Sequence, residues 1–203
     1  MSRLRDKRKR HDQFYKRAKK ERYASRAVYK LAEIDKRFGL IQTGGRVVDL
    51  GCWPGSWTQY CAERVGPGGA VVGIDRNAVE IALPAHVRIL RGDVFEVDPA
   101  TVLGDLEAFD AVISDMAPDT TGIRFTDVAR SVALVDRALA LADAAGAPDS
   151  AFLAKVFVGH GFDELLTQVR SRYRRVKMIK PDSTRSGSME QYIVGRERKP
   201  VQG

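Results

Sequence analysis

The sequence predicts an α/β fold with a mainly parallel seven-stranded sheet, one antiparallel strand and helices on both faces. Seven short apolar runs have the length of strands, and they lack the strict apolar–polar alternation of strands with one solvated face. Segments with helical periodicity separate most of these runs, which is typical of a parallel sheet. The last two runs have no convincing helix between them, so one of the two is expected to be antiparallel.

The first helix is expected over residues 25–38. Ser25 can cap its start, several apolar side chains fall near one face, and Gly39 fits a C-terminal stop. A turn over residues 43–45 then leads into the first strand, residues 46–50.

From residue 46 onward, strands and helices alternate. Glycine- and proline-rich runs over residues 66–69 and 146–148 end two of the helices, and the second of these helices carries a stripe of apolar side chains. The expected strands cover residues 46–50, 70–75, 87–90, 109–114, 151–157, 176–179 and 192–194. The further helices are expected over residues 57–64, 126–145 and 162–172, with a short helix before the third strand.

Composition restricts the class of protein. With 203 residues the chain suits one ordinary domain plus a tail, and a hydrophobic content of 44% excludes wholesale disorder. No stretch approaches the roughly 18 uninterrupted apolar residues of a membrane span, and the basic N-terminus lacks the apolar segment of a secretory signal. Cys52 and Cys61 form no CxxC pattern, which disfavours a disulfide framework and a zinc site. We expect a monomeric, cytoplasmic protein with no metal site and no membrane contact.

Charge is unevenly distributed along the chain, whose formal net charge is +8. Residues 1–37 hold 15 Lys and Arg against 5 Asp and Glu, a balance of +10, and residues 170–203 hold 10 against 3, a balance of +7. The intervening residues 38–169 hold 9 against 18, a balance of −9. Two basic flanks around an acidic middle suggest a polyanionic partner, most often nucleic acid. A solvated tail and an anionic membrane are the alternatives, and no lipidation signal supports the membrane.

The chain is expected to divide into three regions. Residues 1–22 are basic, contain scattered aromatics such as Phe14 and Tyr15, and show little helical periodicity, so they are predicted to be an arm that orders on RNA. Residues 23–199 are predicted to form a single domain, and residues 200–203 a short tail.

A glycine-containing loop follows the first strand and reads Asp49-Leu50-Gly51-Cys52-Trp53-Pro54-Gly55-Ser56-Trp57. It lies where an α/β sheet binds ligands, between the end of a strand and the start of a helix. The loop lacks the G-x-G-x-x-G pattern because position 53 is Trp, and it lacks the Lys-Ser/Thr of a phosphate-binding P-loop. A nicotinamide dinucleotide and ATP are therefore disfavoured as ligands.

Acidic residues recur at the ends of the next strands. Asp75 ends the second strand, where a carboxylate can accept both hydroxyls of a ribose, and Asp93 follows the third strand. A single Asp at such a place is usually a surface or helix-capping residue. Together with the glycine loop, the acids at consecutive strand ends suggest a site for S-adenosyl-L-methionine.

Four motifs occur in a characteristic order along the chain. They are Ser25-Arg26-Ala27-Val28-Tyr29-Lys30-Leu31, Ser114-Asp115-Met116-Ala117-Pro118, Lys155-Val156-Phe157 and Arg185-Ser186-Gly187-Ser188-Met189-Glu190-Gln191-Tyr192. Through these motifs the sequence resembles the FtsJ/RrmJ family (RlmE type) of ribose 2′-O-methyltransferases, over about residues 20–199. The resemblance implies a Rossmann-like class I S-adenosylmethionine-dependent methyltransferase fold.

The resemblance also implies the residues of the site. It assigns a Lys-Asp-Lys-Glu catalytic tetrad to Lys30, Asp115, Lys155 and Glu190, and contacts with S-adenosyl-L-methionine to Gly55, Trp57, Asp75, Asp93 and Asp115. The substrate that it implies is a uridine in the A loop of large-subunit ribosomal RNA, within the large ribosomal subunit. The cofactor loop departs from the family's usual Gly-Ala-Ala-Pro-Gly-Gly-Trp at Cys52, Trp53 and Ser56, and the sequence leaves open whether Trp53 covers the cofactor or points to the core.

The reaction explains the need for a lysine. A ribose 2′-hydroxyl is a poor nucleophile, so a base must take or orient its proton while it attacks the sulfonium methyl group. A lysine can do so only where its ammonium form is disfavoured, which burial and neighbouring cations achieve. Lys155, at the end of a core strand, is the candidate base, with Asp115 and Glu190 expected to hold the two ammonium groups. His160 is a rival base because histidine titrates near neutral pH.

Other functions stay open at this point. Single residues such as Lys30, Lys155 and Glu190 are commonly just surface charges. A methyltransferase acting on transfer RNA or an mRNA cap, a non-enzymatic RNA-binding assembly factor, and a small-molecule methyltransferase on the same fold are the alternatives. The filled tetrad argues against the binding factor, and the basic flanks argue against a small substrate.

Overall fold

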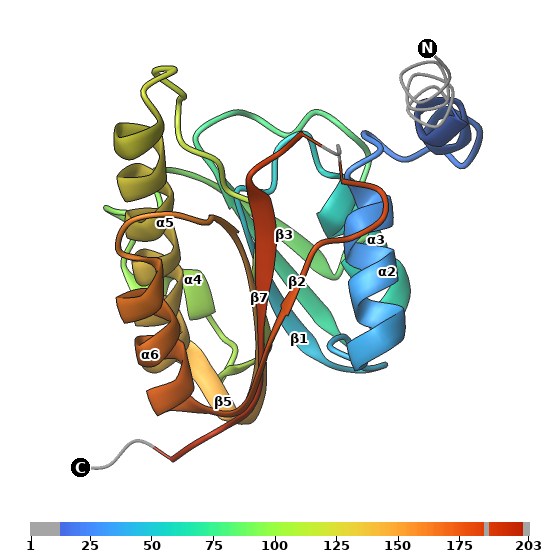
Figure 1. The fold of residues 1–203 in the computed structure, drawn as a ribbon. Helices are drawn as coiled ribbons and strands as arrows, with labels where there is room; N and C mark the ends of the chain where they lie inside the picture. Colours follow the sequence, from blue (N-terminus) through green and yellow to red (C-terminus); the bar gives the residue numbers. More distant parts are fainter. Residues whose placement is uncertain (1–12, 185–186, 201–203) are drawn as a thin grey trace.

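A seven-stranded sheet forms the centre of the computed structural model, which describes residues 13–184 and 187–200 (Figure 1). The strand order is β3-β2-β1-β4-β5-β7-β6. The strands are β1 (Arg46–Leu50), β2 (Ala70–Asp75), β3 (Val87–Arg91), β4 (Phe109–Ser114), β5 (Gly146–Phe157), β6 (Tyr173–Ile179) and β7 (Glu190–Arg198). The helices labelled in the fold are α2 (Val28–Phe38), α3 (Ser56–Val65), α4 (Pro99–Leu103), α5 (Arg124–Ala145) and α6 (Phe162–Arg172).

The strand directions confirm the predicted topology. β3, β2, β1, β4 and β5 pair in parallel, whereas β7 is antiparallel to both of its neighbours, β5 and β6. The carboxyl ends of the parallel strands therefore meet at one edge of the sheet, which is the upper edge in Figure 1. Loops at this carboxyl edge are the usual place for a ligand site in such a fold.

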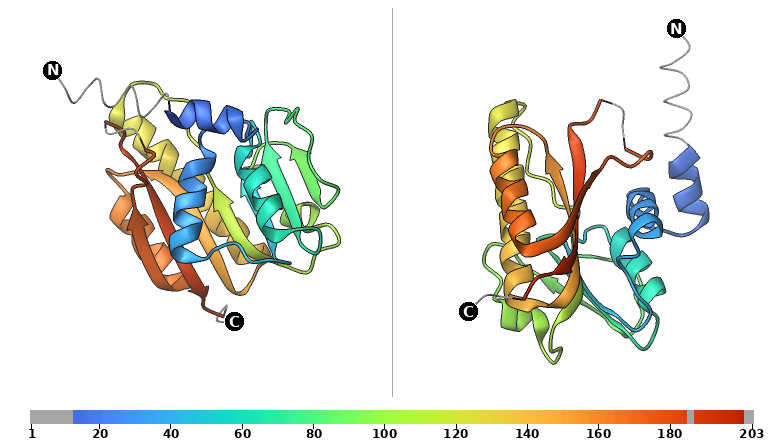
Figure 2. Two further views of the ribbon diagram at one scale, coloured as in Figure 1. Left: turned by 90° about the vertical axis from the view of Figure 1, so that its right-hand side faces the viewer. Right: turned by 60° about the horizontal axis from the view of Figure 1, so that its bottom comes forward.

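Helices cover both faces of the sheet, as predicted. α4, α5 and α6 cover one face and α2 and α3 cover the other (Figures 1 and 2). Each face has its own buried apolar cluster, the first including Val112, Leu139 and Phe152 and the second including Leu31, Trp57 and Tyr192. The central strands β1, β2 and β4 are largely buried on both sides, which is why their sequences are mainly apolar rather than alternating.

Several predicted elements differ from the structure. The expected helix before β3 is absent, since residues 76–86 contain no helical residue. A short helix, α4, instead follows β3, where the Asp98 side chain accepts a hydrogen bond from the Thr101 amide and proline occupies the first helical turn. β5 begins at Gly146 rather than at residue 151, because the chain pairs with Phe109 of β4 as soon as α5 ends.

The N-terminal region also differs from the expectation. Residues 13–20 are helical, whereas little helical periodicity was expected there, and α2 begins at Val28 rather than at Ser25. Ala18 is buried in a small cluster with Val28 and Tyr29, so tertiary packing rather than local periodicity holds this helix in place. Residues 1–12 of the expected arm, and residues 201–203 of the expected tail, lie outside the described residues.

None of the helices in the described part of the chain is both long enough and apolar enough to span a membrane.

Candidate active site

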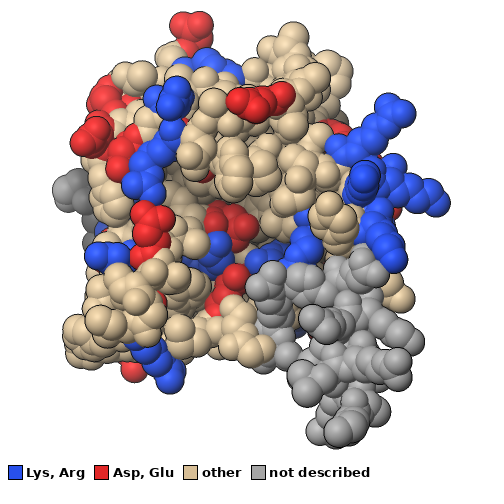
Figure 3. Space-filling model, turned by 90° about the horizontal axis from the view of Figure 1, so that it is seen from above, with Lys and Arg blue, Asp and Glu red and all other residues tan. Residues whose placement is uncertain are grey.

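A cavity of about 700 Å³ opens at the carboxyl edge of the sheet. It lies between the loops that follow β1, β2, β3 and β4 and the second and third turns of α5, and its volume is within the range of small-molecule sites. Figure 3 looks down on this edge and shows acidic and basic side chains together in a hollow near the middle of the face. The lining includes Gly51, Trp53, Asp75, Asn77, Asp93, Phe95, Asp115, Met116, Asp119 and Arg130.

Three predicted cofactor residues line this cavity, namely Asp75, Asp93 and Asp115. The Asp75 carboxylate accepts hydrogen bonds from the backbone amides of Trp53 (3.1 Å) and Asn77 (2.8 Å), one to each oxygen. A carboxylate oxygen can accept more than one hydrogen bond, so both oxygens keep acceptor capacity for a ligand. Asp93 is fixed in the same way, because its Oδ1 accepts from the Phe95 amide at 2.9 Å.

The other two predicted cofactor residues, Gly55 and Trp57, do not line the cavity. Gly55 has a φ of 111°, and a Cβ there would lie 2.4 Å from Ile81 Cδ1, so only glycine permits the close packing of the two segments. Trp57 is 3% exposed, and its indole N–H donates to the Ala27 carbonyl at 2.9 Å. Trp57 thereby anchors the start of α2, the helix that carries Lys30.

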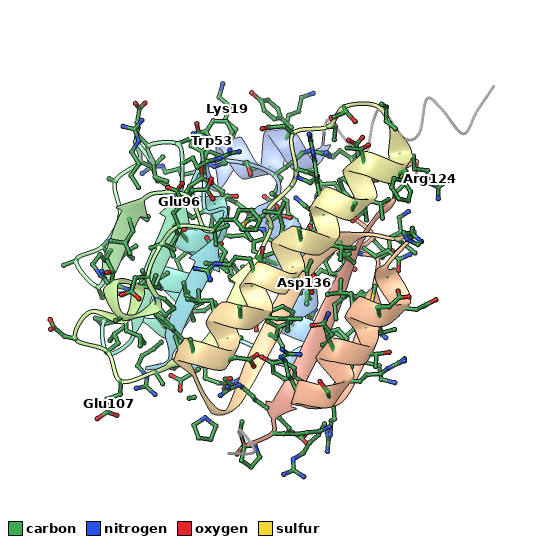
Figure 4. The ribbon with its side chains drawn as sticks, turned by 90° about the vertical axis from the view of Figure 1, so that its left-hand side faces the viewer. Lys19, Trp53, Glu96, Glu107, Arg124 and Asp136 are labelled. Atoms are coloured by element: carbon green, nitrogen blue, oxygen red, sulfur yellow. The ribbon has the colours of Figure 1, made fainter. Side chains whose placement is uncertain are left out.

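Trp53 lies at the surface, not in the core. Its side chain is 55% exposed and lines the cavity. In Figure 4 it lies at the same edge of the molecule as Arg124 at the start of α5, and far from Glu107. The structure therefore places an aromatic ring at the rim of the site, where the family loop commonly has alanine.

The four predicted catalytic residues form two acid–base pairs. Lys155 Nζ donates to the backbone carbonyl of Asp115 and lies 3.1 Å from Asp115 Oδ1. Lys30 Nζ forms an ion pair with Glu190 Oε1. All four side chains are largely shielded from water, with exposed fractions of 9% and 17% for the first pair and 15% and 14% for the second. Pairs shielded in this way interact more strongly than surface ion pairs.

A fifth residue, Tyr192, joins the two pairs. Its hydroxyl lies 2.7 Å from Asp115 Oδ1 and 3.1 Å from Glu190 Oε1, so one O–H is shared between two carboxylates. The ring is fully buried, and Lys30 Nζ lies 5.8 Å from its centroid. Burial and the adjacent carboxylates raise the pKa of the Tyr192 phenol well above its usual value, so the hydroxyl remains a donor.

Strand register explains how these residues meet. Tyr192 lies directly opposite Lys155 in the antiparallel β5–β7 pair, and residues two apart on a strand share a face, so Glu190 lies on the same side as Tyr192. Asp115 directly follows β4, whose last residue, Ser114, pairs with the residue before Lys155. The sequence reasoning did not assign a role to Tyr192. The Glu-x-Tyr spacing on a strand was the available signal.

A buried carboxyl group lies behind the site. Asp49, at 0% exposure on β1, accepts a hydrogen bond from Thr58 Oγ1 at 2.7 Å, while its Oδ1 has no hydrogen-bond partner among the described residues. Burial raises the pKa of Asp49 to about 7, and the negative charges of Asp115 and Asp75 act in the same direction.

Within the described residues, no group of three or more His, Cys, Asp or Glu side chains is arranged to hold a metal ion. His160 lies on the loop after β5, where its ring stacks on Phe125 at a centroid distance of 5.3 Å. The described side chains thus offer two shielded lysine–carboxylate pairs joined by the Tyr192 hydroxyl, with Asp115 of the first pair in the wall of the cavity.

A model of the FtsJ-like methyltransferase family matches residues 23–198. The chain belongs to this family. The match covers every labelled helix and strand of the fold, and it includes both ion pairs of the site. Membership in a methyltransferase family in turn implies the use of a methyl donor, which in general is S-adenosyl-L-methionine.

Individual relatives agree with this family. A protein named ribosomal RNA large subunit methyltransferase E from Desulfosudis oleivorans is 43% identical over 192 residues, which are 95% of this chain and 93% of the relative. A protein of the same name from Syntrophobacter fumaroxidans is 46% identical over 185 residues, 91% of this chain and 94% of the relative.

Solved structures are similar in fold. The crystal structure of a protein described as a ribosomal RNA methyltransferase from Plasmodium falciparum has a TM-score of 0.74 at 24% identity and covers 87% of this chain and 98% of its own. A protein described as an rRNA-methylase from Clostridium thermocellum has a TM-score of 0.59 at 17% identity and covers 83% of this chain and 97% of its own. At these identities the similarity shows the fold alone.

Proposed function

We propose that this FtsJ-like methyltransferase transfers a methyl group from S-adenosyl-L-methionine to a ribose 2′-hydroxyl of large-subunit ribosomal RNA, a uridine of the A loop, with Lys155 as the base. The names of the relatives support ribosomal RNA as the substrate. The observation that carries the ribose chemistry is the contact of Lys155 with Asp115, which lines the cavity. Asp115 belongs both to the cavity lining and to the pair with Lys155, so the methyl donor and the base would meet at this residue.

The cavity fits the cofactor in size and charge. Asp75 keeps acceptor capacity for two ribose hydroxyls, and Asp93 presents a second fixed carboxylate beside it. Gly51 has a φ of 77°, and a Cβ there would lie 2.6 Å from Met116 Cγ, so glycine lets the loop after β1 pack directly against the segment after β4 in the wall of the cavity. When bound, S-adenosyl-L-methionine supplies a methyl group on a positively charged sulfur, and the four aspartates of the lining, Asp75, Asp93, Asp115 and Asp119, suit that charge.

The hydrogen bonds of Lys155 orient its amine for proton transfer. A neutral amine has two N–H donors and one lone pair, and Asp115 offers two acceptors, its carbonyl oxygen and Oδ1. With both donors used on Asp115, the lone pair takes the remaining direction and can accept the proton of the ribose hydroxyl.

The remaining tetrad residues hold this arrangement and the substrate. Glu190 fixes Lys30, whose ammonium group adds a positive charge near the reaction centre. The Tyr192 hydroxyl links Glu190 to Asp115, so the two pairs keep a fixed separation. Positioning of this kind contributes a large part of the rate in a direct transfer between two bound groups.

The basic flanks supply the surface for RNA. Lys16, Arg17, Lys19 and Lys20 project from the helix over residues 13–20, which is docked on the domain through Ala18. Lys and Arg side chains gather at the right-hand margin of the face seen in Figure 3. Cations at the margin of a site contact phosphates and fix the orientation of an RNA without reading its sequence.

The experiment is methyl transfer from labelled S-adenosyl-L-methionine to large ribosomal subunits that lack 2′-O-methylation. The decisive variant is Lys155→Arg, which keeps the positive charge but cannot lose its proton at neutral pH. Lys36→Ala is the matched control, because Lys36 is exposed in the last turn of α2, at the opposite edge of the sheet.

We expect the wild-type protein and Lys36→Ala to label one ribose, and Lys155→Arg to be slower by a factor on the order of 10²–10⁴. Activity of Lys155→Arg near the wild-type value would contradict the proposed base. Label on transfer RNA instead of subunits would move the substrate, and RNA binding without any label would favour the assembly-factor alternative.

A further inference from the structure

Two loops at the carboxyl edge present an exposed aromatic pair outside the cavity. Phe125, in the first turn of α5, is 63% exposed, and its ring stacks on the His160 imidazole at 5.3 Å and an interplanar angle of 27°. Ile123, two residues before Phe125, is also 63% exposed. A cluster of large apolar side chains exposed at the surface indicates a candidate binding site.

The loop before α5 is held in place despite its exposure. The Asp127 carboxylate accepts hydrogen bonds from the Thr121 amide (2.7 Å), the Thr121 hydroxyl (2.8 Å) and the Gly122 amide (3.2 Å). These bonds lower the pKa of Asp127, so it remains a charged acceptor. These hydrogen bonds therefore fix the backbone that carries Ile123 and Phe125.

The loop that carries His160 is fixed against the same helix. The Phe157 amide donates to the Ser131 hydroxyl of α5 at 3.0 Å. A Cβ on Gly159 would lie 3.0 Å from both methyl groups of Val128, so the backbone here touches α5 directly. Because both loops are fixed to the first turns of α5, the aromatic pair is formed in advance, which lowers the entropic cost of binding a ligand there.

A cation accompanies the pair. Arg124 is exposed in the first turn of α5, where a positive charge opposes the helix dipole. Figure 4 shows its side chain extending outward from the start of the helix. Arg124 directly precedes Phe125 in the sequence, and an exposed guanidinium is well suited to contact a phosphate.

We propose that Phe125 and His160 form a stacking platform for an unpaired base of the RNA substrate, close to the target ribose, with Arg124 contacting the adjoining phosphate. This inference rests on the proposed function. His160 follows Lys155 by five residues, so their Cα atoms are at most about 18 Å apart. At about 3.4 Å per stacked nucleotide, that distance corresponds to no more than roughly five nucleotides.

The observations favour a base over a protein segment as the occupant. An exposed ring pair, with an exposed arginine at the neighbouring position of the chain, offers the aromatic stacking and the phosphate contact by which proteins hold single-stranded nucleic acids. Stacking tolerates any base, so the platform would hold the strand while the cavity side of the site acts on the ribose.

The test uses a hairpin RNA with the A-loop sequence that carries 2-aminopurine at successive loop positions. Phe125→Leu keeps an apolar side chain but removes the aromatic face, and Phe125→Trp retains that face. His160→Ala removes the second ring. Binding is followed by 2-aminopurine fluorescence, and KM for RNA and kcat are measured by methyl transfer.

We expect one loop position to be quenched by the wild-type protein and by Phe125→Trp. Phe125→Leu and His160→Ala should lose that quenching and raise KM by roughly five- to a hundredfold, which is the usual contribution of one stacked base, with kcat within about twofold. Equal KM values for Phe125→Leu and the wild-type protein would overturn the proposal. So would a defect seen only on assembled subunits, since that would indicate a ribosomal protein as the occupant.

The two proposals fail in different ways. If the wild-type protein quenches the probe in a Phe125-dependent manner but methylates no RNA, the platform stands and the proposed activity does not. If it methylates RNA and the platform variants behave like the wild-type protein, the activity stands and the platform does not.

Discussion

The Tyr192 hydroxyl is the most specific contact of the site to test, by the change Tyr192→Phe. The ring is fully buried against Trp57 at 6.0 Å, and phenylalanine keeps this packing, so the change removes one oxygen only. That oxygen lies 2.7 Å from Asp115 Oδ1 and 3.1 Å from Glu190 Oε1. A hydrogen bond to a charged group contributes about 1.5–3 kcal/mol, and its loss leaves two shielded carboxylates without their shared donor.

If this contact positions Asp115, and through it Lys155, most of that free energy should appear in the transition state. We expect kcat to fall on the order of tenfold to a hundredfold, since about 1.4 kcal/mol corresponds to a factor of ten. KM for S-adenosyl-L-methionine should change little, and Tm should fall by a few degrees.

The assay is single-turnover methyl transfer with saturating RNA and cofactor, alongside thermal unfolding. Tyr60→Phe is a matched control, because the Tyr60 hydroxyl of α3 donates to the buried Asp35 of α2 at 2.9 Å, away from the two ion pairs. It should lower Tm without a comparable change in kcat. A Tyr192→Phe protein with kcat within twofold of the wild-type value would refute the reasoning that the hydroxyl holds the two pairs together.

Three further predictions concern the cofactor, pH and salt. Binding of S-adenosyl-L-methionine should change the fluorescence of the exposed Trp53 and not that of the buried Trp57. The fluorescence change on binding should therefore vanish in Trp53→Ala. A fluorescence change that persists in this variant would show that the Trp53 ring does not cover the ligand. Burial raises the pKa of Asp49 to about 7, against roughly 3.9 in an unfolded chain, so the folded state binds this proton more tightly than the unfolded state does. As pH rises from about 4 to about 7, the free energy of unfolding of the wild-type protein should therefore fall relative to that of Asp49→Asn. Urea unfolding at pH 5 and pH 8 measures this, and an unchanged difference between the two proteins would be inconsistent with a buried, titrating carboxyl group. Replacing the exposed Lys19 and Lys20 by glutamine should weaken binding to RNA of any sequence, and should reduce the slope of log binding constant against log salt concentration by about 1.4–1.8. An unchanged slope would exclude these two lysines as phosphate contacts.

Sequence patterns predicted the regular parts of the sheet well. α6, β1 and β4 begin and end at the predicted residues. Their apolar patterns are bounded by glycine, proline or charged residues, and such boundaries indicate where a buried element starts and stops. β6 and β7 are longer than predicted, because their pairing with each other stabilises polar residues that no apolar pattern marks.

The missed elements depend on contacts distant in sequence or on very short segments. α4 has five residues, too few for helical periodicity to show, and is defined by its Asp98 cap. The helix over residues 13–20 is held by Ala18 against Tyr29 and by the Tyr29 hydroxyl, which donates to Glu21 at 2.8 Å. Such packing cannot be predicted from local propensity.

The candidate site was predictable by residue type but not by geometry. The positions of Asp75, Asp93 and Asp115 at strand ends follow from the alternation of strands and helices, so their meeting at one edge could be predicted. The pairing of Lys155 with Tyr192 requires the register of β5 on β7, which the sequence does not specify. The exposure of Trp53 could not be predicted from the sequence either, because it depends on how the loop after β1 packs.

The most direct test of the central claim is to identify the atom that receives the methyl group. A 2′-O-methyl group removes the hydroxyl that alkali uses to cleave the adjacent phosphodiester, so labelled subunit RNA can be hydrolysed in alkali and its products separated. We predict that the label stays in one alkali-resistant dinucleotide that maps to the A loop, and that it is absent after reaction with Lys155→Arg. Label released entirely in mononucleotides would mean methylation of a base, and would contradict the assignment of Lys155 as the base for a ribose hydroxyl.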